Sequence, residues 1–321
     1  MRPLFSLSLV LVAGLLLLRR KKSRDYRNAR FYKVLYTPWG FRLAILMRRL
    51  LGAGLGKWLS ASLGFGYAIS HPSTLREIRK NIALLDPARA TRLNAVRLCI
   101  HQAHNFGEYA ELWVNEPGSI LEKLGEKLGI DHIREAHNSG KGCILVTGHL
   151  GFFELGGLVM SCMGFPITTL TLPEPSTSLT QWRADFRQRW GVNTVVVGSD
   201  AFSAVEISRV LGKGDIVALL ADRPFDDNAV MVDLPHGRIP FSTAPVLLSL
   251  LSGAPIVPVG ITREASGKFR IEARPVITPR WMPEGRDATI AFYTRQLAQD
   301  HLVPMFLRHP EQWMHFARLQ K

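Results

Sequence analysis

A histidine and a glutamate that could share a proton stand five positions apart, at His149 and Glu154. A carboxylate bonded to one imidazole nitrogen fixes the tautomer of the ring and leaves the other nitrogen free to accept a proton. A histidine held in this way is suited to act as a general base near neutral pH. The first chemistry that the sequence offers is therefore the removal of a proton from a substrate.

The spacing of these two side chains requires a turn between them. In one regular helix, five residues would place His149 and Glu154 about 140° apart, on different faces. Glycines at 148 and 151 allow the backbone angles of such a turn. Spacing alone favours the alternative, a core histidine bonded to a carbonyl with Glu154 on a solvated helix face. A metal site is less favoured still, because no second histidine or cysteine lies nearby at ligand spacing.

The apolar pattern around this stretch predicts a buried strand at 143–147 and a helix at 152–163. His149 would then lie at the carboxyl end of a strand, where ligands bind in open α/β sheets. Asp222 follows another apolar run, and the same reasoning places it at a strand end.

Strands and helices alternate along the body of the chain, which predicts βαβ units and a largely parallel sheet. The expected strands are 143–147, 167–172, 193–198, 215–221 and 255–262, with a further one near an edge at 269–277. The expected helices are 73–85, 88–113, 152–163, 178–190, 201–212, 243–252 and 287–308. Pro304 should kink or end the last of them. The prediction is one α/β domain.

Two common enzyme signatures are missing. Gly140-Lys141-Gly142 is not followed by the strand-loop-helix order of a phosphate loop. There is also no G-x-S-x-G nucleophile elbow, which argues against a serine hydrolase. The three cysteines, Cys99, Cys143 and Cys162, are too few for a disulfide framework and are expected to be buried thiols in a reducing compartment.

Four further segments stand in the order of a known acyltransferase pattern. They are 79–82 (RKNI), 187–191 (RQRWG), 219–223 (LLADR) and 309–315 (HPEQWMH). With the His-x4-Glu stretch, they resemble the bacterial lipid A late acyltransferase family, which also includes mannoside and predicted lysophospholipid acyltransferases. The resemblance spans roughly residues 70 to 318. It implies a glycerolipid-acyltransferase-like βαβ sheet flanked by helices, with a membrane-associated helical segment at the amino end.

The resemblance implies transfer of a fatty acyl chain from a thioester to a hydroxyl of a glycolipid or lysolipid. The donor would be an acyl carrier protein or coenzyme A thioester, used as a co-substrate, with no bound cofactor. His149 would take the hydroxyl proton, and Glu154 would hold the ring and stabilise the imidazolium, as the acid does in a catalytic triad. The backbone amides of Gly151 and Phe152 are candidate donors to the oxyanion.

The resemblance also points to substrate-binding residues. Arg187 and Arg189 could bind phosphate, which both the acyl donor and a lipid acceptor carry; the alternative is that both are surface charges. Asp222 could orient the acceptor hydroxyl or pair with an arginine, and Arg223 could bind substrate or form a loop salt bridge with Asp226 or Asp227. The Ala-Asp-Arg of this block is more like that of mannoside acyltransferases, so the acceptor stays open between lipid A precursors, lysophospholipids, ornithine lipids and mannosides.

The basic charge is concentrated at the amino end. Residues 1–57 hold thirteen of the 40 Lys and Arg but one of the 26 Asp and Glu, so the rest of the chain is nearly neutral. A nucleic-acid-binding domain would carry its basic patch on the folded body, so nucleic acid is not an expected partner. Oligomeric state is not indicated.

The same segment predicts contact with a membrane. Residues 1–22 read as a short hydrophobic anchor with a basic flank, 23–70 as a basic and aromatic interfacial segment, and 71–321 as the acyltransferase domain. The flank argues that the domain lies on the cytoplasmic side of the inner membrane, with membrane lipids as partners. Two alternatives are an amphipathic helix packed on the body and a non-catalytic membrane-binding protein on this scaffold.

Overall fold

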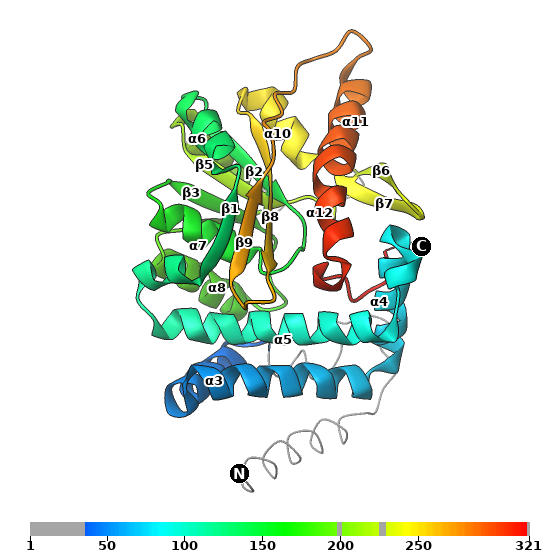
Figure 1. The fold of residues 1–321 in the computed structure, drawn as a ribbon. Helices are drawn as coiled ribbons and strands as arrows, with labels where there is room; N and C mark the ends of the chain where they lie inside the picture. The colour runs from blue at the N-terminus through cyan, green and yellow to red at the C-terminus, as the bar shows by residue number, and fades with distance from the viewer. Residues whose placement is uncertain (1–35, 198–200, 225–228, 320–321) are drawn as a thin grey trace, which may run out of the picture. The chain divides into compact units, whose positions relative to one another are not determined.

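The computed structural model describes residues 36–197, 201–224 and 229–319 (Figure 1). The expected anchor 1–22 and the first part of the expected interfacial segment lie outside these residues, as do Asp226 and Asp227. The chain forms two compact units. Pro117–His309 make up the larger, and residues up to Glu116 together with those from Pro310 onward make up the other.

A seven-stranded sheet in the order β1-β9-β8-β2-β5-β3-β4 is the centre of the larger unit. Five strands, β8, β2, β5, β3 and β4, are parallel, while β9 pairs antiparallel with β8 and parallel with β1. The strands are β1 (Leu124–Leu128), β2 (Cys143–Thr147), β3 (Ile167–Thr171), β4 (Asn193–Val196), β5 (Ile216–Leu220), β8 (Ile256–Arg263) and β9 (Phe269–Ala273). The predicted α/β class with a largely parallel sheet is confirmed.

Helices flank this sheet (Figure 1). They are α6 (Ile130–Asn138), α7 (Glu154–Cys162), α8 (Thr177–Arg189), α9 (Ala201–Gly212), α10 (Ala244–Ser252), α11 (Arg286–Gln296) and α12 (Val303–Arg308). The sequence pattern missed α6, the edge strand β1, and an antiparallel hairpin of β6 (Ala229–Leu234) and β7 (Gly237–Ser242). These elements are short, and β1 (LGEKL) has leucines only at its two ends, so each carries little of the signal on which pattern reading depends.

β2 lies at the middle of the sheet, and its sequence explains why. Its first four residues, Cys143 to Val146, are all buried. A strand that is covered by helices on both faces reads as a continuous apolar run, whereas a half-exposed strand alternates. The run before His149 therefore builds the most protected strand of the unit, and His149 leaves its carboxyl end.

The last helical region of the larger unit changes its winding. The regular α-helix α11 ends at Gln296, residues Leu297–Leu302 are π-helical, and α12 follows with Pro304 in its first turn. A proline lacks the N–H, and its ring crowds the carbonyl four residues earlier. The wider π turn gives that ring room, so the chain continues as a helix past Pro304.

The other unit pairs two long helices, α3 (Pro38–Ser70) and α5 (Arg92–Val114). Thr37 and Thr91 cap their amino ends through hydroxyl oxygens that accept backbone N–H bonds. A Cβ at Gly64 would lie 2.7 Å from the Cα of Ile100 on α5, so the absence of a side chain lets the helix backbones approach closely. Among the described residues, no helix combines the length and the apolar character that crossing a membrane requires.

The carboxyl-terminal segment of this unit is held by α4 (Pro72–Leu85). The Asn81 side-chain amide donates to the carbonyls of His315 (3.1 Å) and Ala317 (2.7 Å), and its oxygen accepts the N–H of Leu319 (3.2 Å). Arg89 also pairs with Glu311 at 2.9 Å. The early RKNI segment and the late HPEQWMH segment are therefore bonded to each other.

The turn between β2 and α7 rests on the neighbouring strand β8. Gly151 has φ +57°, in the left-handed region, and a Cβ there would overlap the carbonyl oxygen of Ile261 on β8. Both the backbone angle and the space therefore require glycine at this position.

Gly151→Ala should lower the free energy of unfolding by about 3 kcal/mol, since it adds backbone strain to an overlap with β8. Gly164→Ala is the matched control, because Gly164 also has positive φ (+88°) but open space at its Cβ. We expect about 1 kcal/mol of loss there, from the left-handed angle alone. Urea unfolding measures both, and equal losses would contradict the packing argument.

Candidate active site

Two neighbouring strands bring His149 and Asp222 to one place. β2 and β5 pair in parallel with Thr147 opposite Leu220, and the Ala221 N–H continues the ladder by donating to the Thr147 carbonyl at 2.9 Å. His149 and Asp222 each stand two residues beyond this last paired position. Because the carboxyl ends of parallel strands share one edge, the two side chains meet there.

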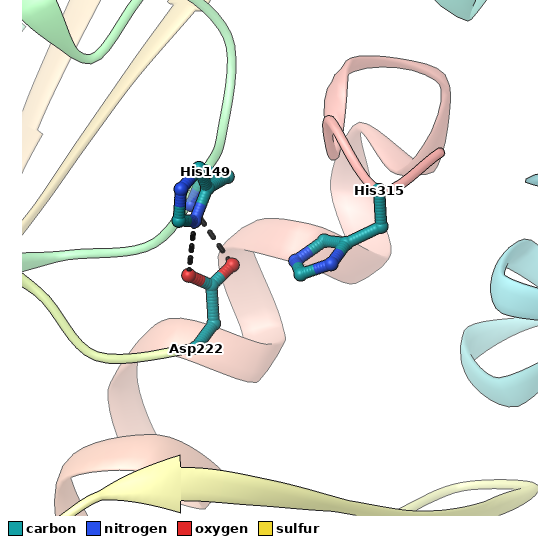
Figure 2. Close-up of side chains that lie close together, drawn as sticks. All are labelled: His149, Asp222 and His315. Atoms are coloured by element: carbon teal, nitrogen blue, oxygen red, sulfur yellow. Dashed lines mark hydrogen bonds and ion pairs between the residues drawn. The ribbon is translucent and has the colours of Figure 1, made fainter. Parts of the chain in front are cut away.

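Asp222 makes two hydrogen bonds to His149, which Figure 2 shows as dashed lines. Asp222 Oδ1 lies 2.7 Å from Nδ1 of the ring, and Oδ2 accepts the backbone N–H of His149 at 2.8 Å. An ionised carboxylate only accepts, so Nδ1 carries the proton and Nε2 is left as the acceptor. In the structure Asp222 therefore bonds the imidazole of His149, whereas the sequence predicted Glu154 as this partner.

The burial of the pair is unequal. The Asp222 side chain has no solvent exposure, while 22% of the His149 side chain is exposed. The carboxylate is therefore fixed inside the protein, and the imidazole remains partly open to a ligand.

The surroundings of His149 keep its ring neutral. Burial is the main cause that lowers the pKa of His149 below its usual value, and the positive charge of Arg223 lowers it further. Asp222 opposes both effects through its charge and its hydrogen bond, and Arg183 adds a smaller lowering. At neutral pH the imidazole is therefore uncharged, which is the state that a proton acceptor needs.

Glu154 is the first residue of α7, and it is buried between two arginines of α8. Arg187 bonds it through Nε and, at 3.1 Å, through a terminal nitrogen, and Arg183 bonds it at 2.5 Å. Arg183 also pairs with Glu174 in the loop before α8. The two arginines lower the pKa of Glu154 to about 2 against the opposing effect of burial. Glu154 is therefore an ionised carboxylate that joins α7 to α8, and it does not lie on a solvated helix face.

The remaining predicted residues lie at different depths. Arg187 is buried and bonded to Glu154, whereas Arg189 lies on the exposed side of the same helix. Arg223 is half-buried and acts on the pKa of His149. Gly151 and Phe152 are buried in the turn between His149 and α7. Their roles toward a substrate or an oxyanion stay predictions.

Sequence reasoning missed Arg183 and its partner Glu174. A signal was present, because Arg183 and Arg187 are four residues apart and so share one face of the predicted helix. Two buried arginines on one face require acidic partners. Glu154 and Glu174 supply these partners.

The fold and this pair place the protein among α/β proteins that carry the groups for general-base catalysis. Comparison with known proteins narrows the class. The family of bacterial lipid A biosynthesis acyltransferases matches residues 43–321, so the chain belongs to this family. The resemblance drawn from the sequence segments is therefore confirmed, and the protein is an acyltransferase whose family indicates acyl transfer to a glycolipid.

Individual relatives carry two kinds of name. The chain is 23% identical to a phosphatidylinositol mannoside acyltransferase of Mycobacterium tuberculosis (strain ATCC 25618 / H37Rv) over 243 residues, which is 74% of each chain. It is 24% identical over 170 residues to the protein of the same name from Mycolicibacterium smegmatis, covering 51% of this chain and 56% of the relative. It is 28% identical to a lipid A biosynthesis acyltransferase of Haemophilus influenzae over 170 residues, 51% of each chain.

Glu154→Gln should destabilise the protein, because it leaves two arginines beside a neutral side chain. Lowering the carboxyl pKa from 4.5 to about 2 corresponds to about 3 kcal/mol of stability. A lowered pKa means that this stability is present above pH 4.5 and is lost as pH falls towards 2. Denaturant unfolding against pH should therefore show wild type losing its advantage over the variant across this range.

Glu206→Gln is the control for this variant. Glu206 pairs with Arg209 one turn away on α9, where the Arg209 side chain is exposed and the Glu206 side chain is partly exposed. We expect little change in stability there, because water screens an exposed pair. A loss as small for Glu154→Gln as for Glu206→Gln would show that the buried cluster adds no stability.

Proposed function

We propose that the protein moves a fatty acyl chain from a thioester to a hydroxyl of a glycolipid, with His149 as the general base. The observation that carries the proposal is the 2.7 Å hydrogen bond between Asp222 and Nδ1 of His149, which leaves Nε2 able to accept a proton. A hydroxyl is a poor nucleophile, and it must lose its proton as it attacks a carbonyl carbon. A neutral, partly exposed imidazole meets this need.

The reaction then has two proton transfers. The acceptor oxygen attacks the thioester carbonyl while its proton passes to Nε2 of His149. The C–S bond breaks as the tetrahedral intermediate collapses, and the imidazolium returns the proton to the departing thiolate. An ester and a free thiol result. Asp222 accepts from Nδ1–H throughout and stabilises the imidazolium, and the amides of Gly151 and Phe152 are the proposed oxyanion donors.

Glu154 receives a supporting role in this proposal. Its bonds to Arg183 and Arg187 fix the first turn of α7 against α8, and α7 begins five residues after His149. Arg189 and Arg223 are the proposed phosphate-binding residues, since the first is exposed and the second is half-buried beside His149. Arg187 would act mainly through Glu154.

The donor would be an acyl carrier protein or coenzyme A thioester. The acceptor is a glycolipid resembling a lipid A precursor or a phosphatidylinositol mannoside, the two kinds named among the relatives. Lysophospholipids and ornithine lipids are alternatives of the same reaction class. A non-catalytic membrane-binding protein on the same scaffold is the alternative of another class, and the intact His149–Asp222 pair favours the enzyme.

The exposed side of α3 supports a second part of the proposal, attachment to the cytoplasmic face of the inner membrane. Trp39, Leu46 and Leu50 are exposed at spacings of seven and four residues. Trp58, Phe65 and Ile69 repeat these spacings beyond the break in the helix at Gly52. Both sets follow the repeat that places apolar side chains along one face of a helix.

The charges along α3 match an anionic lipid surface. Exposed positions include Arg42, Arg49 and Lys57, and the helix contains no Asp or Glu. Each exposed cation near an anionic membrane contributes about 1 kcal/mol, and tryptophans prefer the depth of the headgroups. We therefore propose that α3 lies along the membrane surface next to the amphipathic acceptor.

Asp222→Asn should lower kcat about a hundredfold or more, because the ring loses its orienting acceptor and the imidazolium loses its stabilising charge. Asp222 raises the pKa of His149, so the remaining activity of the variant should persist to lower pH than that of wild type. Labelled acyl carrier protein and coenzyme A thioesters, mixed with lipid extract from the native membrane, provide the assay, and mass spectrometry identifies the acylated lipid.

His149→Ala is run beside this variant in the same assay. Loss of the acylated lipid in a folded His149→Ala protein supports the proposed base. Turnover near wild type in that variant would remove it. No consumption of either donor by wild type would favour the non-catalytic alternative.

A fluorescent probe that senses polarity tests the membrane surface. Attached at Leu50→Cys in a Cys162→Ser background, it should shift to the blue with anionic vesicles, and the shift should weaken in high salt. Leu251→Cys is the matched control, because Leu50 and Leu251 are 70% and 71% exposed. Equal responses at the two positions would contradict a role for α3.

A further inference from the structure

Gly148, the residue before His149, is crowded on the side where a side chain would stand. A Cβ there would lie 2.5 Å from Cζ of Phe306 and 2.8 Å from Oδ2 of Asp222. The edge of the Phe306 ring and the catalytic carboxylate therefore flank the same point on the chain. The backbone angle at Gly148 does not require glycine, so it is this close approach that does.

Phe306 comes from near the carboxyl end of the larger unit. It lies on α12, is fully buried, and follows the π-helical residues Leu297–Leu302. The preceding side chain, Met305, presses on Gly260 of β8, where a Cβ would lie 2.5 Å from its sulfur. α12 thus sits against the carboxyl end of β2 and the middle of β8 through two glycines, and Figure 1 draws it in red below α11.

The π segment sets which side chains point at these glycines. A π turn holds more residues than an α turn, so the residues after it are rotated relative to a continuous α-helix. Such segments are frequent at functional sites. Without it, Met305 and Phe306 would present a different side of the helix to the sheet.

We infer that Phe306 is a positioning residue that holds the Asp222 carboxylate against His149 and excludes water from that side of the pair. The inference rests on the proposed role of His149 as the base. The ring offers the carboxylate no hydrogen bond, so it does not compete with the two donors of His149 for the Asp222 oxygens. An apolar wall also strengthens the electrostatic interaction between the two groups.

The causes of the lowered pKa of His149 fit a site from which water is excluded on one side. The charged groups that act on His149 are Asp222 and Arg223 after β5, and Arg183 on α8. Burial is the largest single cause of the lowered pKa of His149, and Phe306 is a fully buried aromatic ring whose edge flanks Gly148, as Asp222 does. Letting water reach this side should therefore raise the pKa of His149 towards its usual value.

Gly148→Ala, Phe306→Leu and the double variant test the contact. Gly148→Ala should lower kcat on the order of a hundredfold, with a smaller change in KM, because the new methyl group displaces either the ring or the carboxylate. In the double variant the smaller leucine leaves room for the methyl group, so about tenfold of this loss should return. Phe306→Leu alone should raise the pKa of His149, followed by NMR of ¹³C-labelled histidine with His149→Gln for assignment.

Gly260→Ala is the matched control, since it places the same 2.5 Å overlap on Met305 of the same helix. The flexible methionine can move aside, and the His149 pKa should stay as in wild type. The inference is overturned if Phe306→Leu leaves that pKa unchanged and the double variant is no more active than Gly148→Ala.

The NMR titration does not depend on turnover, so it separates this inference from the proposed function. Activity retained in His149→Ala would remove the base, and the effect of Phe306→Leu on the His149 pKa would still decide whether the ring shields the pair.

Discussion

The pairing of β2 with β5 is the constraint on which the candidate site depends. His149 and Asp222 are 73 positions apart in the chain, and they meet because Thr147 stands opposite Leu220 at the end of the ladder. β3 and β4, which come between in sequence, are placed outside β5 in the sheet. A shift of one residue in this register would move Asp222 along the edge and turn its side chain to the other face.

The candidate site has two buried carboxylates with different electrostatic partners. Asp222 is bonded to His149, and Glu154 follows His149 by five positions in the chain. Glu154 is bonded by two guanidinium groups, which satisfies its charge and holds it ionised with a pKa of about 2. Asp222 is bonded to the neutral ring and the backbone N–H of His149, so its charge lies where it can stabilise a positive charge that forms on this ring. Environment assigns the roles here, as it does in other enzymes with paired carboxylates.

Much of the fold follows from local pattern, because the apolar runs predicted β2, β5 and their helices to within a residue or two. His149 and Asp222 could each be placed at a strand end for the same reason. Their contact could not be predicted, because it depends on the order of strands in the sheet, which local periodicity does not contain. Nearness in sequence predicted Glu154 as the partner of His149. In the structure Glu154 is bonded by Arg183 and Arg187, which lie 29 and 33 residues later on α8. Charge satisfaction in a buried region is a property of the packed structure.

A lowered pKa makes His149 a weaker base at rest, and this has to be reconciled with its proposed work. The cost of burial falls on the charged form, so the free site holds a neutral ring that is ready to accept a proton at neutral pH. Once the ring is protonated, the Asp222 carboxylate lies 2.7 Å from the charged Nδ1–H. The stabilisation by Asp222 therefore acts mainly as the proton is transferred, where it lowers the barrier. It is largely absent from the resting state, where it would only favour the uptake of a proton from water.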